Sequence, residues 1–196
     1  MRDGLVWTPV KVAWLSGVSR PGTSALSPEQ LAFVEGLRVP AEWKLWSNFP
    51  YGEPGPTFRP VPLIVASAVN ALRFLGSSLP LRRPSSRRHW AAVKGSCDRL
   101  LLITSSCGSQ IGAALEGSSE GGAKVEALGL GAVDWGAGGL DLERVVGRED
   151  RLARLFTGRR RRSELVGVGH MDYAGSSAAL EEANRWLVAR LGGAVL

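Results

Sequence analysis

The fold of this chain is most constrained by residues 98–106, a segment with an apolar centre that leads without a spacer into a predicted helix at 107–117. Residues 100–103 are apolar one after another, with no polar residue between them. A strand with this pattern is covered on both faces, as happens in parallel sheets that carry helices on each side. The junction is rich in serine and glycine, which suits a sharp turn. The sequence therefore predicts a buried strand, a tight turn and a helix that starts at once.

The rest of the chain alternates in the same way between strand and helix patterns. The helix at 27–37 has the clearest start, because Ser27, Pro28 and Gln30 supply an N-cap, a proline at the first helical position and a capping-box partner. Repeated alternation indicates a mostly parallel sheet with helices on both faces. We therefore expect an α/β fold, a three-layer sandwich, as one domain over residues 1–196. The predicted strands are 11–17, 41–51, 98–106, 124–133, 143–147 and 163–169, and the predicted helices are 27–37, 63–76, 89–97, 107–117, 148–156 (or a turn) and 176–191, with a loop at 52–62 and a polar, basic connection at 77–89.

The net charge of +6 at pH 7 raises the question of a nucleic-acid partner. The excess is concentrated in the arginines of 82–88 and 159–162. We expect both stretches to be loops, where a run of charge is usually a solvated surface. We therefore do not expect a nucleic-acid partner, and the sequence leaves the oligomeric state open.

Cys97 and Cys107 are the two cysteines of the chain, and they lack the spacing and the histidine neighbours of a structural metal site. We therefore expect free thiols, no metal and no cofactor. No apolar run is long enough to span a bilayer, and the first residues lack the pattern of a secretory signal. These features predict a cytoplasmic protein with no membrane partner.

The turn after the strand at 98–106 carries the first candidate site residue. Residues 104–109 read Thr-Ser-Ser-Cys-Gly-Ser, so small residues flank Ser106 between a strand and a helix. This register resembles the nucleophile elbow of the α/β-hydrolase superfamily, in which a serine stands between small residues. The resemblance implies an α/β-hydrolase-like fold and a nucleophilic role for Ser106. Thr104 departs from the pattern, since the family normally has glycine there, and a shifted register would make Cys107 the nucleophile.

Two further segments continue the resemblance. The segment around Asp150 resembles the family's segment in which an acid follows a strand and a glycine-containing turn. Glu149 and Asp134 remain alternatives for the acid. His170 lies between the last predicted strand and the last predicted helix, where the family carries its base. The order serine, acid, histidine is also the family's order, so the resemblance implies that Ser106, Asp150 and His170 form one catalytic set.

The same resemblance implies how a substrate would be held. The backbone N–H groups of Cys107 and Val18 would form the oxyanion hole. The loop after the first strand reads Ser16-Gly17 where the family has His-Gly, and both residues are candidates for substrate contact, together with Trp135. The expected reaction is acyl transfer from a small or medium ester or thioester, through an acyl-enzyme on the serine. The interval between serine and acid leaves no room for a large lid.

Two other interpretations stay open at this point. The departures at Thr104 and Ser16 allow a hydrolase-like domain without catalytic activity. The seven tryptophans, together with the arginine-rich stretches, allow a basic nucleic-acid-binding domain in which indole rings stack on bases. Labelling by a fluorophosphonate would favour the enzyme, whereas salt-sensitive binding of nucleic acid would favour the binding domain.

Overall fold

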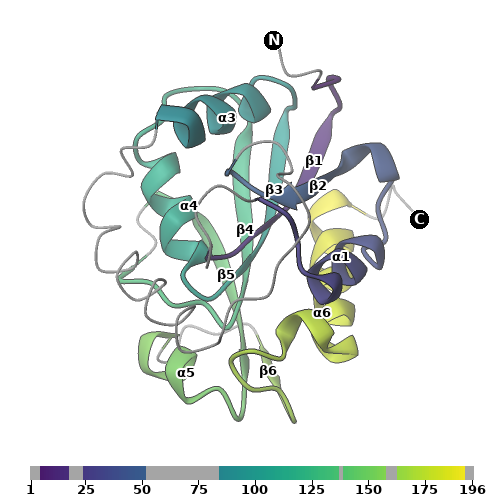
Figure 1. Cartoon of the computed structure of the whole chain (residues 1–196), viewed down its shortest axis with the longest axis vertical. Helices are drawn as coiled ribbons and strands as arrows, with labels where there is room; N and C mark the ends of the chain where they lie inside the picture. Colours follow the sequence, from purple (N-terminus) through teal and green to yellow (C-terminus); the bar gives the residue numbers. More distant parts are fainter. Residues whose placement is uncertain (1–4, 18–23, 52–83, 137–138, 158–162, 193–196) are drawn as a thin grey trace.

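The computed structural model describes residues 5–17, 24–51, 84–136, 139–157 and 163–192. The predicted loop at 52–62, the predicted helix at 63–76 and Val18 lie outside these ranges. Within them, six parallel strands form one sheet in the order β2-β1-β3-β4-β5-β6 (Figure 1). The strands are β1 (Val10–Leu15), β2 (Lys44–Asn48), β3 (Arg99–Ser105), β4 (Lys124–Leu130), β5 (Asp141–Gly147) and β6 (Ser163–Leu165). The helices are α1 (Pro28–Glu35), α3 (Pro84–Lys94), α4 (Gly108–Glu116), α5 (Arg151–Thr157) and α6 (Ser177–Leu191), with short 3-10 helices η1 (Ala41–Trp43) and η2 (Tyr173–Gly175).

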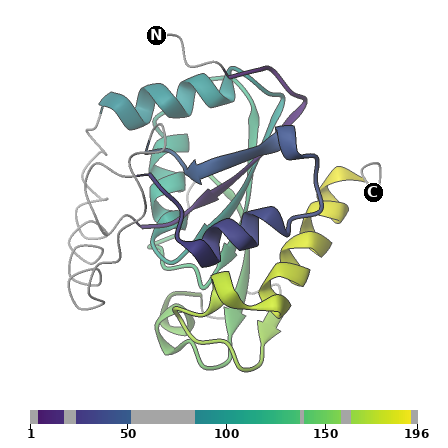
Figure 2. The ribbon, with the colours of Figure 1, turned by 45° about the vertical axis from the view of Figure 1, so that its right-hand side comes forward.

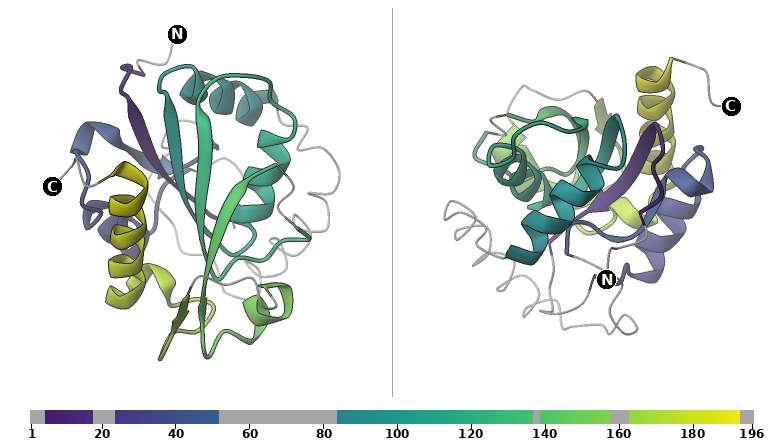
Figure 3. Two further views of the ribbon diagram at one scale, coloured as in Figure 1. Left: turned by 180° about the vertical axis from the view of Figure 1, so that it is seen from behind. Right: turned by 90° about the horizontal axis from the view of Figure 1, so that it is seen from above.

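Helices cover both faces of the sheet, so the predicted three-layer α/β sandwich is confirmed. α1 and α6 lie together on one face, and α3 and α4 lie on the other, as two further directions of view show (Figures 2 and 3). The side chains of β3 explain its unbroken apolar sequence. Leu101 and Ile103 belong to the core on the α1 and α6 side, while Leu100 and Leu102 belong to the core on the α3 and α4 side. Because successive side chains of a strand point to opposite faces, a central strand needs apolar residues on both.

The start of α1 follows its sequence signals. Ser27 Oγ accepts a hydrogen bond from the N–H of Gln30 at 3.2 Å, and Gln30 Oε1 accepts one from the N–H of Ser27 at 3.0 Å. This reciprocal pair is the predicted capping box. Phe33 of α1 then packs edge-on against Trp14 of β1, with ring centroids 5.1 Å apart. The helix is thereby fixed against the strand that leads into the site.

The predicted basic connection at 77–89 is wrong from residue 84 onward, because α3 starts at Pro84. A proline fits the first turn of a helix, where its missing N–H has no intrahelical partner to lose. Trp90 is buried in the core while the arginines at 87 and 88 face solvent. These two arginines, which suggested a loop, therefore lie on the exposed side of an amphipathic helix, while Arg82 and Arg83 lie outside the described residues.

Two predicted strands are shorter than expected. In the segment 41–51, the first three residues form η1, and only β2 pairs with β1. In the segment 163–169, only the first three residues form β6. Gly167 has a φ of +72°, which turns the chain out of the sheet and frees the following residues to form a loop.

The strand order places a topological switch point at the carboxyl ends of β1 and β3. The chain adds β2 on one side of β1 and then returns to add β3 on the other side. The helices that follow β1 and β3, α1 and α4, lie on opposite faces of the sheet (Figure 3). At such a switch point the connections diverge, and ligands of open α/β sheets bind outside the strand ends there.

Candidate active site

A turn of two residues joins β3 to α4, and this turn carries Ser106. β3 ends at Ser105 and α4 starts at Gly108. Ser106 has a φ of 53°, and it is the only residue other than glycine with a positive φ in the described ranges. Residues with a side chain seldom adopt this region, so the turn holds strain of about 1–3 kcal/mol. A strained serine between a strand and a helix is the geometry of a nucleophile elbow.

Gly108 lets the start of α4 press against the end of β1. A Cβ at position 108 would lie 2.1 Å from the carbonyl oxygen of Leu15, so any side chain there would displace backbone. Thr104, the residue that departs from the family's glycine, is fully buried in β3 and in register with Leu15 of β1 and Gly129 of β4. The turn keeps its positive φ with threonine at this position. The departure at Thr104 therefore does not prevent the elbow backbone from forming.

His170 reaches Ser106 from the loop that follows β6. Its Nε2 lies 3.0 Å from Ser106 Oγ. The loop is fixed upstream, where the N–H of Val168 donates to Glu149 Oε2 at 3.1 Å. It also packs tightly on the end of β5, since a Cβ on Gly147 would lie 1.9 Å from the carbonyl oxygen of Val168. At this distance the imidazole can take the serine proton directly.

Asp150 meets the other nitrogen of the imidazole. Its two oxygens lie 2.9 and 3.1 Å from Nδ1 of His170. The carboxylate is fully buried and also accepts hydrogen bonds from the N–H of Ala153 and the hydroxyl of Tyr173, both at 2.8 Å. Burial by itself would raise the pKa of Asp150, but the hydrogen bonds outweigh burial and hold the pKa below its ordinary value. Asp150 is therefore ionised at neutral pH, which favours a proton on Nδ1 and leaves Nε2 as the acceptor.

The alternatives considered from the sequence have other contacts. Glu149 accepts a hydrogen bond from the backbone of the histidine loop. Asp134 forms a 2.8 Å ion pair with Arg144 of β5. Cys107 occupies the N-cap position of α4 with its side chain buried and without a side-chain capping hydrogen bond, while the imidazole of His170 contacts the serine hydroxyl. The structure thus brings together the serine, the histidine and the aspartate that the resemblance implies.

Ser16 anchors the loop that follows β1. It is buried, its N–H donates to Asn48 Oδ1 at 2.9 Å, and Asn48 Nδ2 donates to its Oγ at 3.1 Å. Gln30 Nε2 donates to the same Oγ at 3.3 Å. Gly17 follows and is half-buried, while Val18 lies outside the described residues. Ser16 therefore holds the loop in place. Both oxyanion donors, the N–H groups of Cys107 and Val18, stay predictions.

Trp135 stands on a loop that is tied to the elbow. The N–H of Val133 donates to the carbonyl oxygen of Ser106 at 3.0 Å, and the N–H of Trp135 donates to Gln110 Oε1 of α4 at 2.9 Å. Its side chain is nevertheless 61% exposed, and it packs edge-on against Phe156 of α5 with ring centroids 5.3 Å apart. An aromatic pair held this way presents apolar surface beside the strand ends.

The sequence analysis did not single out Tyr173 or Asn48. Tyr173 lies in η2 with its ring buried, and its hydroxyl contacts Asp150. Asn48 ends β2 and holds Ser16. Each acts on a residue of a different loop, and a local pattern in one sequence carries no signal of such a contact.

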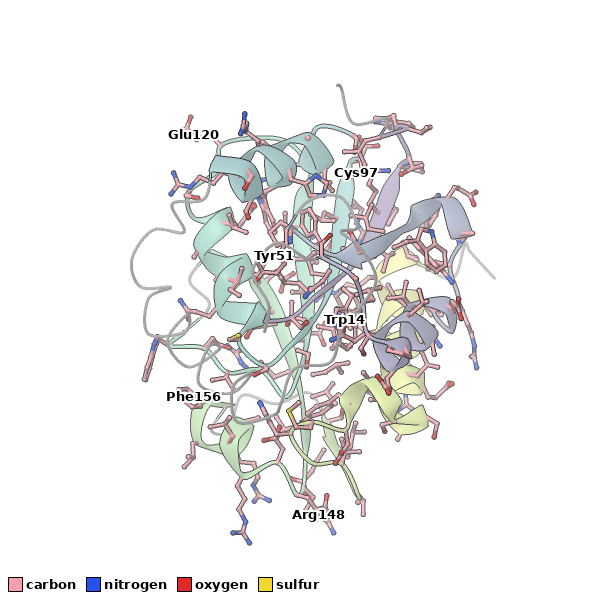
Figure 4. The ribbon with its side chains drawn as sticks, in the orientation of Figure 1. Trp14, Tyr51, Cys97, Glu120, Arg148 and Phe156 are labelled. Carbon is pink, nitrogen blue, oxygen red and sulfur yellow. The ribbon has the colours of Figure 1, made fainter. Side chains whose placement is uncertain are left out.

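Other features of the described part of the chain do not indicate a second functional site. Within it, no group of three or more His, Cys, Asp or Glu residues is arranged to hold a metal ion. Cys97 and Cys107 are both buried, and within the described residues neither is joined in a disulfide. Cys97 lies toward the α3 end of the molecule, away from Phe156 (Figure 4). No helix in the described ranges has the length and apolar character needed to cross a membrane.

A concave basic surface lies beside α5. It is lined by Arg148, Glu149, Arg151 and Arg154. Arg148 pairs with Glu164 at 3.1 Å, and Arg154 donates to the carbonyl oxygen of Arg148 at 2.9 Å. Two of these guanidinium groups therefore serve the protein's own structure, and the surface adds little to the nucleic-acid interpretation.

Comparisons with known proteins add little to this geometry. No family model matches the chain, and no curated protein matches it. The chain is similar to a solved structure from Agrobacterium tumefaciens, a protein of unknown function described as a suspected α/β-hydrolase, with a TM-score of 0.45. The two chains are 14% identical, and the match covers 95% of this chain and 88% of that one. Similarity at this level carries no conclusion about a site, so function must rest on the residues themselves.

Proposed function

We propose that this protein is a serine hydrolase in which Ser106 is the nucleophile, His170 the general base and acid, and Asp150 the residue that orients the imidazole. One observation carries the proposal, a continuous chain of hydrogen bonds. It runs 3.0 Å from Ser106 Oγ to His170 Nε2 and 2.9 Å from His170 Nδ1 to Asp150 Oδ2. The positive φ of the serine adds support, because strain kept at one polar residue is a common mark of a functional site.

In the first half-reaction, Ser106 Oγ attacks the substrate carbonyl carbon while His170 Nε2 takes the hydroxyl proton. The electron pair of the carbonyl bond moves to oxygen, where the N–H of Cys107 and, in the proposal, the N–H of Val18 stabilise it. The carbonyl then re-forms and the bond to the leaving group breaks. The imidazolium gives its proton to the departing alcohol or thiol, and the acyl group remains on the serine.

In the second half-reaction, water attacks the acyl-enzyme and gives a proton to His170 Nε2. Collapse of the tetrahedral intermediate releases the carboxylic acid, and the imidazolium returns its proton to Ser106 Oγ. Asp150 remains ionised in both halves and stabilises the imidazolium each time it forms. The enzyme ends in its starting state, so the residues of this site need no added oxidant or reductant.

The surroundings of the serine favour small or medium acyl esters or thioesters. Trp135 and Phe156 offer an apolar surface on the side of β4 and β5. Ser16 and Gly17 border the site on the side of β1, where the bonds to Asn48 keep the loop in place. These contacts also speak against an inactive hydrolase-like domain, because the departures at Thr104 and Ser16 coexist with the hydrogen bonds that catalysis requires.

A fluorophosphonate probe tests the proposal, since it reacts covalently with an activated serine. We expect labelling of the wild-type protein, no labelling of Ser106→Ala and loss of most labelling in His170→Ala. Cys107→Ala, next to the nucleophile, serves as the matched control and should keep its labelling. Labelling that survived in Ser106→Ala and vanished in Cys107→Ala would assign the nucleophile to the thiol. A folded wild-type protein that reacts with no probe would not be a serine hydrolase.

A further inference from the structure

Tyr173 joins three loops at the carboxyl end of the sheet. Its side chain is 1% exposed. Its hydroxyl oxygen lies 2.7 Å from the backbone nitrogen of Gly147, where β5 ends, and 2.8 Å from Asp150 Oδ2. Its ring packs on the turn after β4, because a Cβ on Gly131 would lie 2.3 Å from the ring. The side chain is therefore fixed by contacts with three segments of the chain.

The direction of the two hydrogen bonds of Tyr173 follows from the chemistry of the groups. The backbone N–H of Gly147 can only donate, so the phenol oxygen accepts there. The one phenolic proton is then available for Asp150 Oδ2. Burial first, and the charge of Asp150 in addition, raise the pKa of the Tyr173 hydroxyl. The phenol thus stays protonated and keeps donating across the pH range of an enzyme assay.

The carboxylate of Asp150 needs this second donor. Among the described residues no lysine or arginine pairs with it, although it is fully buried. The N–H of Ala153 holds Oδ1 at 2.8 Å. His170 Nδ1 also contacts the two oxygens, but it belongs to the ring that the carboxylate has to orient. Apart from that ring, one donor on one oxygen leaves rotation about the Cβ–Cγ bond soft, as is usual for aspartate. A donor on the second oxygen removes that freedom.

We propose that Tyr173 is a positioning residue, whose hydroxyl fixes the rotation of the Asp150 carboxylate so that Oδ2 faces Nδ1 of His170. The phenol lies behind the carboxylate and acts on the reaction only through it. The effect of the Tyr173 hydroxyl on catalysis rests on the proposed function, whereas its effect on the orientation of the Asp150 carboxylate does not. Loss of the hydroxyl should loosen the imidazole and slow proton transfer, with little effect on substrate binding.

The test is Tyr173→Phe, which keeps the buried ring and removes only the hydroxyl. Tyr51→Phe is the matched control, since Tyr51 is the only other tyrosine in the chain. The first readout is the downfield proton resonance of the imidazole N–H that faces Asp150. It is assigned by its loss in His170→Ala, which is simple because the chain has two histidines. The second readout is hydrolysis of p-nitrophenyl acetate, with kcat and KM measured separately.

We expect the resonance to move upfield or to broaden by exchange in Tyr173→Phe and to stay in place in Tyr51→Phe. We expect kcat to fall about tenfold, equal to about 1.4 kcal/mol in the barrier, with KM within about twofold. An unchanged resonance together with an unchanged kcat would overturn the proposal. So would a lower melting temperature with both readouts unchanged, because Tyr173 would then serve stability alone.

Failure of the proposed function is distinguishable from failure of this inference. If the wild-type protein hydrolyses no ester but Tyr173→Phe shifts the resonance, the carboxylate is positioned as inferred and the hydrolase proposal fails. If Tyr173→Phe does not fold, 3-fluorotyrosine is incorporated into Tyr51→Phe, so that only position 173 carries it. The more acidic phenol donates a stronger hydrogen bond, and an imidazole resonance that does not move would then count against the proposal.

Discussion

Replacing Ser106 by glycine or by alanine tests whether the elbow is strained. Both substitutions remove the hydroxyl, so the loss of its contact with His170 is the same in each and cancels from the comparison. The two variants differ in how they tolerate the φ of 53°. Alanine keeps the steric conflict of a Cβ in the left-handed region, and glycine relieves it.

The magnitude follows from two opposing effects. A left-handed backbone costs a residue with a side chain about 1–2 kcal/mol. Glycine avoids this cost, but it loses more conformational freedom on folding than alanine does, which costs about 0.5–1 kcal/mol. We therefore expect Ser106→Gly to exceed Ser106→Ala in free energy of unfolding by about 0.5–1 kcal/mol. For a chain of this size the difference in melting temperature is about 1–4 °C.

The assay is urea unfolding of both variants followed by circular dichroism, with thermal unfolding as a second measure. Ser105 provides the matched control, since it is the last residue of β3 and has no positive φ. There alanine should be more stable than glycine by about 0.5–1 kcal/mol, as in an ordinary strand. The order of the two variants should therefore reverse between neighbouring positions. Alanine at least as stable as glycine at position 106 would refute the inference that the turn is strained.

Three further predictions concern the acid and the apolar surface. Asp150→Asn should lower kcat about a thousandfold or more, since an amide favours the wrong imidazole tautomer. As a control, Asp134→Asn should keep kcat, but its free energy of unfolding should fall by about 3 kcal/mol because Arg144 loses its buried partner. Because the folded-state pKa of Asp150 is lowered, its stabilising contribution is present above the ordinary aspartate pKa of about 4 and is lost as pH falls through the folded value. The difference in urea midpoint between wild type and Asp150→Asn should therefore shrink below about pH 4, and a constant difference would contradict the shift. Trp135→Ala should lower kcat/KM for p-nitrophenyl octanoate about tenfold, or about 1.4 kcal/mol, and should change kcat/KM for p-nitrophenyl acetate little. Trp46→Ala, at another exposed tryptophan, is the control and should change neither value. Equal losses on both esters would exclude a contact between Trp135 and the acyl chain.

Local patterns predict those parts of the fold that depend on neighbours in the chain. The apolar run of β3 reports that both faces are covered, and Ser27 with Gln30 reports where α1 begins. The start of α3 escaped prediction because its arginines give a loop-like composition, whereas the burial of Trp90 depends on a sheet that forms elsewhere. The end of β6 was missed for a similar reason, since hydrophobicity continues past the turn at Gly167.

In the candidate site, too, some residues can be predicted from their neighbours in the chain, and others depend on contacts between distant segments. The alternation of elements predicts that Ser106 and His170 each lie between a strand and a helix, and the resemblance to the α/β-hydrolases then implies their roles. The acid is not predicted in this way, because Asp134, Glu149 and Asp150 all follow strands and differ only in where the chain turns them. Tyr173 and Asn48 depend entirely on contacts between loops, and no spacing in a single sequence encodes those contacts.

The contrast between Asp134 and Asp150 shows what makes one buried carboxylate suited to the role of acid. Asp134 has a full positive charge beside it, Arg144 at 2.8 Å, so its charge is already compensated. Asp150 is stabilised by neutral donors, a backbone N–H and a phenol, which keep it ionised without cancelling its charge. Its negative charge therefore acts on the imidazole of His170, the group that gains a proton in the proposed reaction. A carboxylate paired with arginine would stabilise an imidazolium much less. The absence of a lysine or arginine partner in the described surroundings of Asp150 therefore suits it to the role that we propose for it beside His170.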